Sequence, residues 1–133
     1  MVQMRFAFTN NRKRMLCKYR SYSRAMGSRA IEQGLHCVAV TDHNKPLGMK
    51  AIQEAAKDKP ITVYPCVEIT CDTTKIHLLI LFDPSKGEEA VKSFLSKCDI
   101  EHTNYGKQAA ITNKSVIDVA QIASKKCITI KFL

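Results

Sequence analysis

The chain reads Cys37-Val38-Ala39-Val40-Thr41-Asp42-His43, an apolar run that ends in an acid and an imidazole. A run that is apolar on both faces is typical of a parallel strand buried on both sides. Packing gives such a strand no reason to end in Asp42 and His43, because strand ends normally carry turn residues. Both residues lie just past the predicted strand at 36–41, where side chains splay and both can reach one site.

Two more apolar runs carry a polar residue at one end. Glu68 follows Val63-Tyr64-Pro65-Cys66-Val67, and His77 opens the run Leu78-Leu79-Ile80-Leu81-Phe82. In an α/β barrel the ends of successive strands converge on one rim, which is where such folds build their sites. Two carboxylates and two imidazoles at one rim suit a divalent metal such as zinc, manganese or iron.

Each of these residues also has an explanation without a metal. Asp42 would suit a cap for the turn before Pro46. Glu68 would suit a pair with a lysine, since an uncompensated buried carboxylate is costly. His77 would suit a satisfied core or edge position. Four separate explanations are then needed, so the common metal site is the simpler hypothesis. His36 and His102 lack a comparable context, and we expect both at the surface.

The remaining patterns alternate between strands and helices. They predict strands at 36–41, 61–70, 76–82 and 127–132, and helices at 46–57, 85–97 and 114–125. Glu88 stands at a capping-box position for the second of these helices, and Asn113 is a candidate cap for the third. Residues 28–33 are predicted to form the last turns of a further helix, with Gly34 as its C-terminal cap. The alternation predicts an α/β domain with a mainly parallel sheet and flanking helices. The strands at 61–70 and 76–82 are close enough to be antiparallel neighbours or to flank an irregular crossover.

The composition bounds the class of protein. The chain has 133 residues, of which 45% are hydrophobic and 25% charged, which fits one folded domain and excludes wholesale disorder. No apolar run approaches the length of a membrane span, and the start lacks a secretory signal, so we expect a cytoplasmic protein without membrane contact. The six cysteines form no C-x-x-C pair, which argues against a zinc ribbon, and we expect free thiols.

The formal charge of +9 is concentrated at the start of the chain. Residues 1–30 hold eight basic residues and no acid, whereas the remainder holds 13 basic and 12 acidic residues. One interpretation is contact with the phosphate backbone of nucleic acid through residues 1–30. The other is a solvated terminus without a dedicated partner, which we favour because no base-reading motif accompanies the charges.

Three motifs in order resemble one family. The stretch 34–44 resembles the second motif of the polymerase and histidinol phosphatase (PHP) metal-dependent phosphoesterases. Pro65-Cys66-Val67-Glu68-Ile69-Thr70 is similar to their third motif, usually written P-G-V-E-I-T, and Ile76-His77-Leu78-Leu79 resembles the following strand, whose histidine is a ligand. The resemblance covers about residues 28–130, and the ordered trio is more specific than any one motif.

The resemblance implies a fold, an activity and a site. The family fold is a distorted seven-stranded (βα) barrel with two or three metal ions at its rim, and members hydrolyse phosphomonoesters or phosphodiesters. By resemblance Asp42, His43, Glu68 and His77 would bind metal, with Glu68 bridging ions and Asp42 able to act as a ligand or as an orienter of one. Asp42, His43 and Glu68 would then be the catalytic residues, and the cofactor a divalent ion such as manganese, zinc or iron.

The chain departs from the family at both ends. Residues 1–30 contain neither the H-x-H pair nor the S-D-G segment, and the later histidine before a proline and the final D-x-H are missing after Phe132. We therefore expect a basic, atypical segment at 1–27 and an incomplete PHP-type barrel at 28–133, with fewer ions than the full site. This is the pattern of a truncated, frame-disrupted or degenerate relative.

Two functions follow from this partial match. One is a PHP-type phosphoesterase, impaired by its missing ligands. The alternative is a non-catalytic remnant or interaction module, with nucleic-acid contact through the basic segment. An open barrel edge would expose unpaired backbone groups, which favours self-association or a complementing chain.

Overall fold

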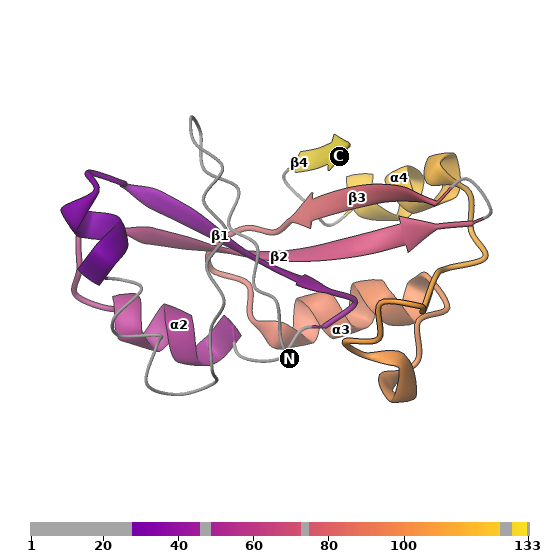
Figure 1. Cartoon of the computed structure of the whole chain (residues 1–133), viewed down its shortest axis with the longest axis horizontal. Coiled ribbons are helices and arrows are strands. Elements are labelled where there is room, and N and C mark those ends of the chain that lie inside the picture. The colour runs from indigo at the N-terminus through magenta and orange to yellow at the C-terminus, as the bar shows by residue number, and fades with distance from the viewer. Residues whose placement is uncertain (1–27, 46–48, 73–74, 126–128, 133) are drawn as a thin grey trace.

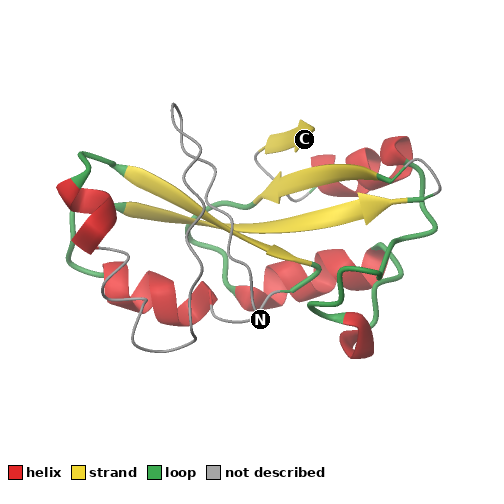
Figure 2. Cartoon of the chain, viewed as in Figure 1, coloured by secondary structure: helices red, strands yellow, loops and turns green. Residues whose placement is uncertain are grey.

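The computed structural model describes residues 28–45, 49–72, 75–125 and 129–132 (Figure 1). The basic segment at 1–27 lies outside these residues, and so does most of the stretch 1–30 to which one interpretation assigns a contact with nucleic acid. The described part is a mixed α/β fold in which helices flank an open sheet (Figure 2).

Within the described residues the sheet has four strands, in the order in which they occur along the chain. These are β1 (Cys37–His43), β2 (Thr62–Cys71), β3 (Ile76–Leu81) and β4 (Thr129–Phe132). β1 and β2 pair in parallel, whereas β3 is antiparallel to both β2 and β4. Three strands therefore run in one direction and β3 runs against them, so the antiparallel alternative for β2 and β3 is confirmed.

The described part of the chain contributes the helices α2 (Met49–Ala56), α3 (Glu88–Lys97) and α4 (Val116–Ser124), with a short 3₁₀ turn, η1, at His102–Asn104. A helical turn at 28–32 precedes β1. It ends at Gly34, which has a φ of 72° and so acts as the predicted C-terminal cap.

The two predicted N-terminal helix caps are wrong. Helix α3 begins after Gly87 without a side-chain cap, because the Asp83 carboxylate instead accepts hydrogen bonds from the backbone and hydroxyl of Ser85. Helix α4 begins after Ser115 rather than Asn113. Ser115 and Asp118 form a reciprocal capping box there, which satisfies two backbone donors that a helix start leaves open.

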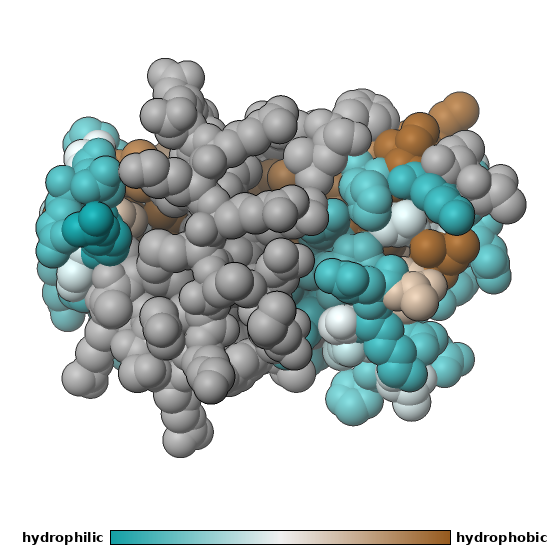
Figure 3. Space-filling model, in the orientation of Figure 1, coloured by the Kyte–Doolittle hydropathy of each residue, from teal (hydrophilic) through white to brown (hydrophobic). Residues whose placement is uncertain are grey.

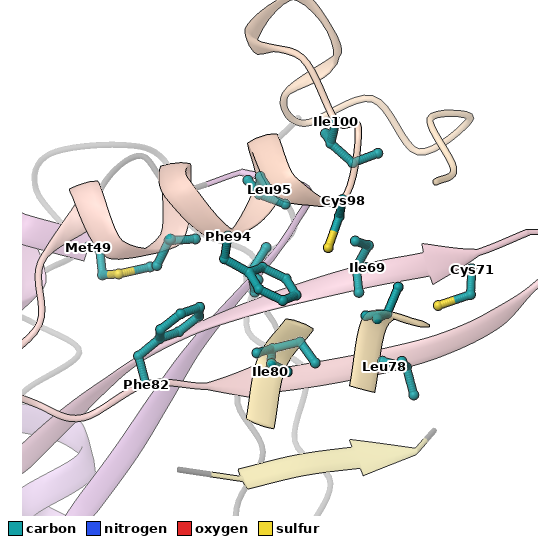
Figure 4. Close-up of a cluster of buried hydrophobic side chains, with 14 residues drawn as sticks. Met49, Ile69, Cys71, Leu78, Ile80, Phe82, Phe94, Leu95, Cys98 and Ile100 are labelled. Carbon is teal, nitrogen blue, oxygen red and sulfur yellow. The ribbon is translucent and has the colours of Figure 1, made fainter. Parts of the chain in front are cut away.

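The helices pack against one face of the sheet. Alternate residues of β2 and β3 (Val67, Ile69, Cys71, Leu78 and Ile80) meet apolar residues of all three helices in the main core (Figure 4). Phe82 and Phe94 lie edge to face there, with ring centroids 5.7 Å apart. The two-residue repeat of the strands therefore places apolar side chains on this face, and the apolar stripes of the helices cover them.

The other face of the sheet carries a smaller buried cluster. Ala39, Cys66 and Leu79 form it, and Tyr64 and Leu81 pack against it. Along β2 and β3 these residues alternate with those of the main core. Thr41, Glu68 and Thr70 share this second face, and they are buried although they are polar.

Beyond the end of β1, a loop residue pairs with β2. The ladder of β1 ends where His43 pairs with Glu68, and Thr112 continues it with a parallel bridge to Cys71. The amide of Thr112 donates to the Thr70 carbonyl at 3.0 Å, and the amide of Asp72 donates to the Thr112 carbonyl at 2.8 Å. The Thr112 hydroxyl also donates to the Cys98 carbonyl at 2.5 Å. The end of β2 is therefore paired on both sides.

The turn after β1 is tied to the same loop. Asn44 adopts a φ of 48°, its amide donates to the Glu68 carbonyl at 2.8 Å, and its side chain donates to the Ala110 carbonyl at 2.6 Å. Asparagine tolerates this left-handed conformation better than most residues do. The turn therefore fixes the position of His43 relative to β2.

The cysteines of the described part agree with the sequence analysis. Cys37, Cys66, Cys71 and Cys98 are free thiols as predicted, while Cys17 and Cys127 lie outside the described ranges. No described helix has the length and apolar character that a membrane span requires.

A few large apolar side chains stay exposed at the surface. Figure 3 shows hydrophobic surface at the right-hand end of the molecule, where Figure 1 places α4 and the neighbouring ends of β2 and β3. The exposed large apolar side chains of the described part are Ile76, Ile111 and Ile117.

Candidate metal centre

Three of the four predicted ligands come together on the face of the sheet opposite the helices. The parallel register places His43 directly beside Glu68, and the antiparallel register places His77 beside Thr70, two residues farther along the same face. His43, Glu68 and His77 each offer a ligand atom, and these atoms lie within 4.8 Å of one another. In the described part of the chain this is the one such group.

Glu68 lies between the two imidazoles. Its Oε1 is 3.2 Å from Nδ1 of His77 and 3.9 Å from Nδ1 of His43. The two rings have centroids 6.1 Å apart. The exposed side-chain fraction is 6% for Glu68, 16% for His43 and 45% for His77. Solvent therefore reaches the group at the His77 ring and hardly reaches the Glu68 carboxylate.

The donor set fits a divalent metal. Two imidazoles and one carboxylate are a common ligand set of catalytic zinc sites, which keep a fourth position for water or substrate. The Nε2 atom of His43 is buried and has no hydrogen-bond partner among the described residues. A buried polar atom normally has a partner, and an imidazole nitrogen with a free lone pair is the form that binds a metal. The group could therefore hold one ion.

Asp42 is not part of this group. β1 extends through His43 instead of ending at Thr41, so strand alternation sends the side chains of Asp42 and His43 to opposite faces. The register partner of Asp42 is Val67, which belongs to the main core under the helices. The expectation that both neighbours reach one site is thus not met in this structure, and the ligand role of Asp42 stays a prediction.

The environment of Asp42 is unusual for an acid. Its side chain is buried, and neither carboxylate oxygen has a hydrogen-bond partner among the described residues. Burial raises the pKa of Asp42 from 3.8 to about 6, and the positive charge of Lys45 offsets part of that rise. Removal from water disfavours the charged form, which is the physical cause of the larger effect.

The other predicted histidine positions are confirmed, and one site residue was missed. His36 and His102 are exposed, as expected. Thr70, by contrast, is buried beside the group, with its hydroxyl oxygen 3.0 Å from Nδ1 of His77. The signal in the sequence was its position two residues after Glu68 in a strand, which places both side chains on one face.

The comparisons with known proteins leave the family open. No protein-family model matches the chain, and no curated protein matches it.

Proposed function

We propose that the protein binds one divalent metal ion at His43, Glu68 and His77 and hydrolyses a phosphate ester there, in the manner of the PHP phosphoesterases that its motifs resemble. The observation that carries the proposal is the convergence of three ligand atoms within 4.8 Å, from three neighbouring strands. The same resemblance implies a distorted (βα) barrel, of which the open four-stranded sheet would be an incomplete part.

Each side chain has a distinct task in this proposal. His43 would offer its buried and unpaired Nε2 atom, and Glu68 would supply negative charge to balance the cation. His77 would complete the set from the side that faces solvent, since nearly half of its side chain is exposed. A phosphate ester would reach the centre from that side.

A bound divalent metal would lower the pKa of a coordinated water and neutralise charge on the phosphoryl oxygens. Zinc, manganese and iron all accept imidazole and carboxylate ligands, so the donor set alone leaves the metal open among them. Three ligands suit a single ion, which is fewer than the full family site holds.

The first test is the metal content of the full chain purified without chelator. We expect about one ion per chain, because three protein ligands with an open position form one site. The double variant His43→Ala/Glu68→Ala should lose it. The matched control His36→Ala/Glu101→Gln changes an exposed imidazole and an exposed carboxylate, and it should keep it.

The second test is hydrolysis of p-nitrophenyl phosphate and bis-p-nitrophenyl phosphate by protein loaded with manganese or zinc. Turnover that Glu68→Gln abolishes and Glu101→Gln preserves would support the phosphoesterase. Metal bound without turnover above the Glu68→Gln background would reject catalysis of these esters and favour a non-catalytic domain that keeps the metal.

A further inference from the structure

Two oxygens approach the same nitrogen of His77. Nδ1 lies 3.2 Å from Oε1 of Glu68 and 3.0 Å from Oγ1 of Thr70. Thr70 is the direct cross-strand partner of His77, and Glu68 lies two residues away on the same face of β2. The antiparallel register therefore brings a carboxylate and a hydroxyl to one side of the ring.

An ion that Glu68 and His77 share would lie on this side of the ring. The Oε1 atom of Glu68 faces Nδ1, so the ion would bind His77 through Nδ1 and not through the nitrogen on the far side. The hydroxyl of Thr70 faces the same nitrogen. A position that suits both the carboxylate and the imidazole is therefore also within reach of this hydroxyl.

The spacing of these atoms is close to that of ligands around one ion. Metal–nitrogen and metal–oxygen bonds of about 2.0–2.2 Å place neighbouring ligand atoms of a tetrahedral site about 3.3–3.6 Å apart. The two distances from Nδ1 of His77, 3.2 Å to Glu68 and 3.0 Å to Thr70, differ from that spacing by a few tenths of an ångström. Small side-chain movements would therefore bring all three atoms onto one ion.

We propose that the hydroxyl of Thr70 is a further donor to the metal ion, beside the side chains of His43, Glu68 and His77. This inference rests on the proposed metal centre and adds one oxygen to its donor set. Threonine and serine hydroxyls bind magnesium in the same way in phosphate-binding loops. Thr70 is 4% exposed, and a branched side chain has few rotamers, so its hydroxyl is held beside the site.

The added oxygen bears on which metal the centre would prefer. Zinc sites commonly have four ligands, so a water would be a fifth once Thr70 is bound. Manganese favours oxygen ligands and octahedral coordination, which leaves room for both. The Thr70 hydroxyl should therefore contribute more to the affinity for Mn²⁺ than to the affinity for Zn²⁺. A residue that merely packed against His77 would affect both ions alike.

The position of the ring proton of His77 gives the first test. In the neutral ring without an ion, Glu68 favours a proton on Nδ1, because a carboxylate can only accept a hydrogen bond. Long-range ¹⁵N–¹H NMR of the full chain at about pH 8, where the rings are neutral, shows which nitrogen carries the proton. We expect the proton on Nδ1 with chelator present, and on Nε2 with Zn²⁺ bound at Nδ1.

Calorimetric titration of the full chain with Mn²⁺ and with Zn²⁺ gives the second test. Thr70→Val removes the hydroxyl at nearly constant shape, Thr70→Ser keeps it, and Thr62→Val makes the same change at an exposed position of β2. Thr70→Val should weaken Mn²⁺ binding about 10-fold or more, since losing a ligand should cost at least as much as losing a supporting contact. It should weaken Zn²⁺ binding less. Thr70→Ser should keep most of the affinity for both ions, and Thr62→Val should keep all of it.

Zn²⁺ bound at Nε2 of His77 would overturn the inference, because neither oxygen faces that nitrogen. Equal weakening of both ions in Thr70→Val, or binding as tight as in the unaltered protein, would remove Thr70 from the donor set and leave the metal centre standing. Should Thr70→Val fail to fold, as judged by circular dichroism, Thr70→Ser decides together with the NMR result, and loss of most of its Mn²⁺ affinity would count against the hydroxyl. Failure of the unaltered protein to bind either ion would instead reject the metal centre itself.

Discussion

Replacing Asp42 by asparagine should change how the free energy of unfolding depends on pH. Burial raises the pKa of Asp42 from 3.8 to about 6 in the folded protein. Between these two pKa values the folded state binds more protons than the unfolded state does, so stability falls as pH rises through that window. Each unit of the pKa difference corresponds to about 1.4 kcal/mol, so the ionised carboxylate costs the fold about 3 kcal/mol once the pH exceeds the folded pKa.

The assay is urea unfolding of both proteins at about pH 4.5 and about pH 7.5, with chelator present. Integrating the linkage relation between these pH values predicts that the advantage of Asp42→Asn grows by about 2 kcal/mol at the higher pH. A constant cost of burying the amide cancels in this comparison. Asp58→Asn, the same chemical change at an exposed carboxyl, controls for the lost charge.

An advantage that stays constant with pH, or that shrinks as pH rises, would refute the reasoning. The first result would mean that the carboxylate finds compensating charge or water in solution. The second would mean that the folded protein favours the ionised form, as it would if a retained cation sat beside Asp42.

Three further predictions concern the fold. Ser115→Ala should cost about 1 kcal/mol in urea unfolding because it breaks the capping box of α4, whereas Asn113→Ala should cost much less; equal costs would contradict the assigned cap. Phe94→Ala should destabilise by about 3–5 kcal/mol because the ring is 1% exposed in the main core, and a loss well below this range would place it elsewhere. Alkylation by iodoacetamide, followed by peptide mass spectrometry, should label Cys37 quickly and Cys71 slowly at neutral pH. Cys37 is exposed, whereas burial, aided by the charge of Asp72, raises the pKa of Cys71 to about 11; comparable rates would contradict this.

Much of the local structure was predictable because it depends on short-range patterns. The apolar runs around Val38 and Leu78 located their strands to within a residue or two, and the left-handed Gly34 ended its helix as expected. The N-terminal cap of α4 was not predictable in this way, because Asn113 and Ser115 are chemically similar candidates. The choice between them depends on whether Asp118 returns a hydrogen bond, which requires the backbone path.

The candidate site was also predictable only in part. The three-residue group was predictable because His43, Glu68 and His77 interrupt apolar runs that leave them no packing role. The separation of Asp42 was not, since it depends on the strand continuing for two more residues. Threonine is a common residue in strands, so Thr70 does not stand out in the sequence. Its contact with His77 can be recognised only once the register of β2 and β3 is known.

The bridge between Thr112 and the end of β2 has a consequence for the dynamics of the loop that carries it. An amide that is bonded inside a sheet exchanges its hydrogen slowly, while most loop amides exchange within the dead time of an experiment. The amides of Asp72 and Thr112 should therefore exchange together and as slowly as the centre of β2, although Thr112 belongs to no named strand. Residues 99–112 would then open with the sheet as one cooperative unit, and the half of β2 that carries Glu68 and Thr70 could not fray without releasing this loop.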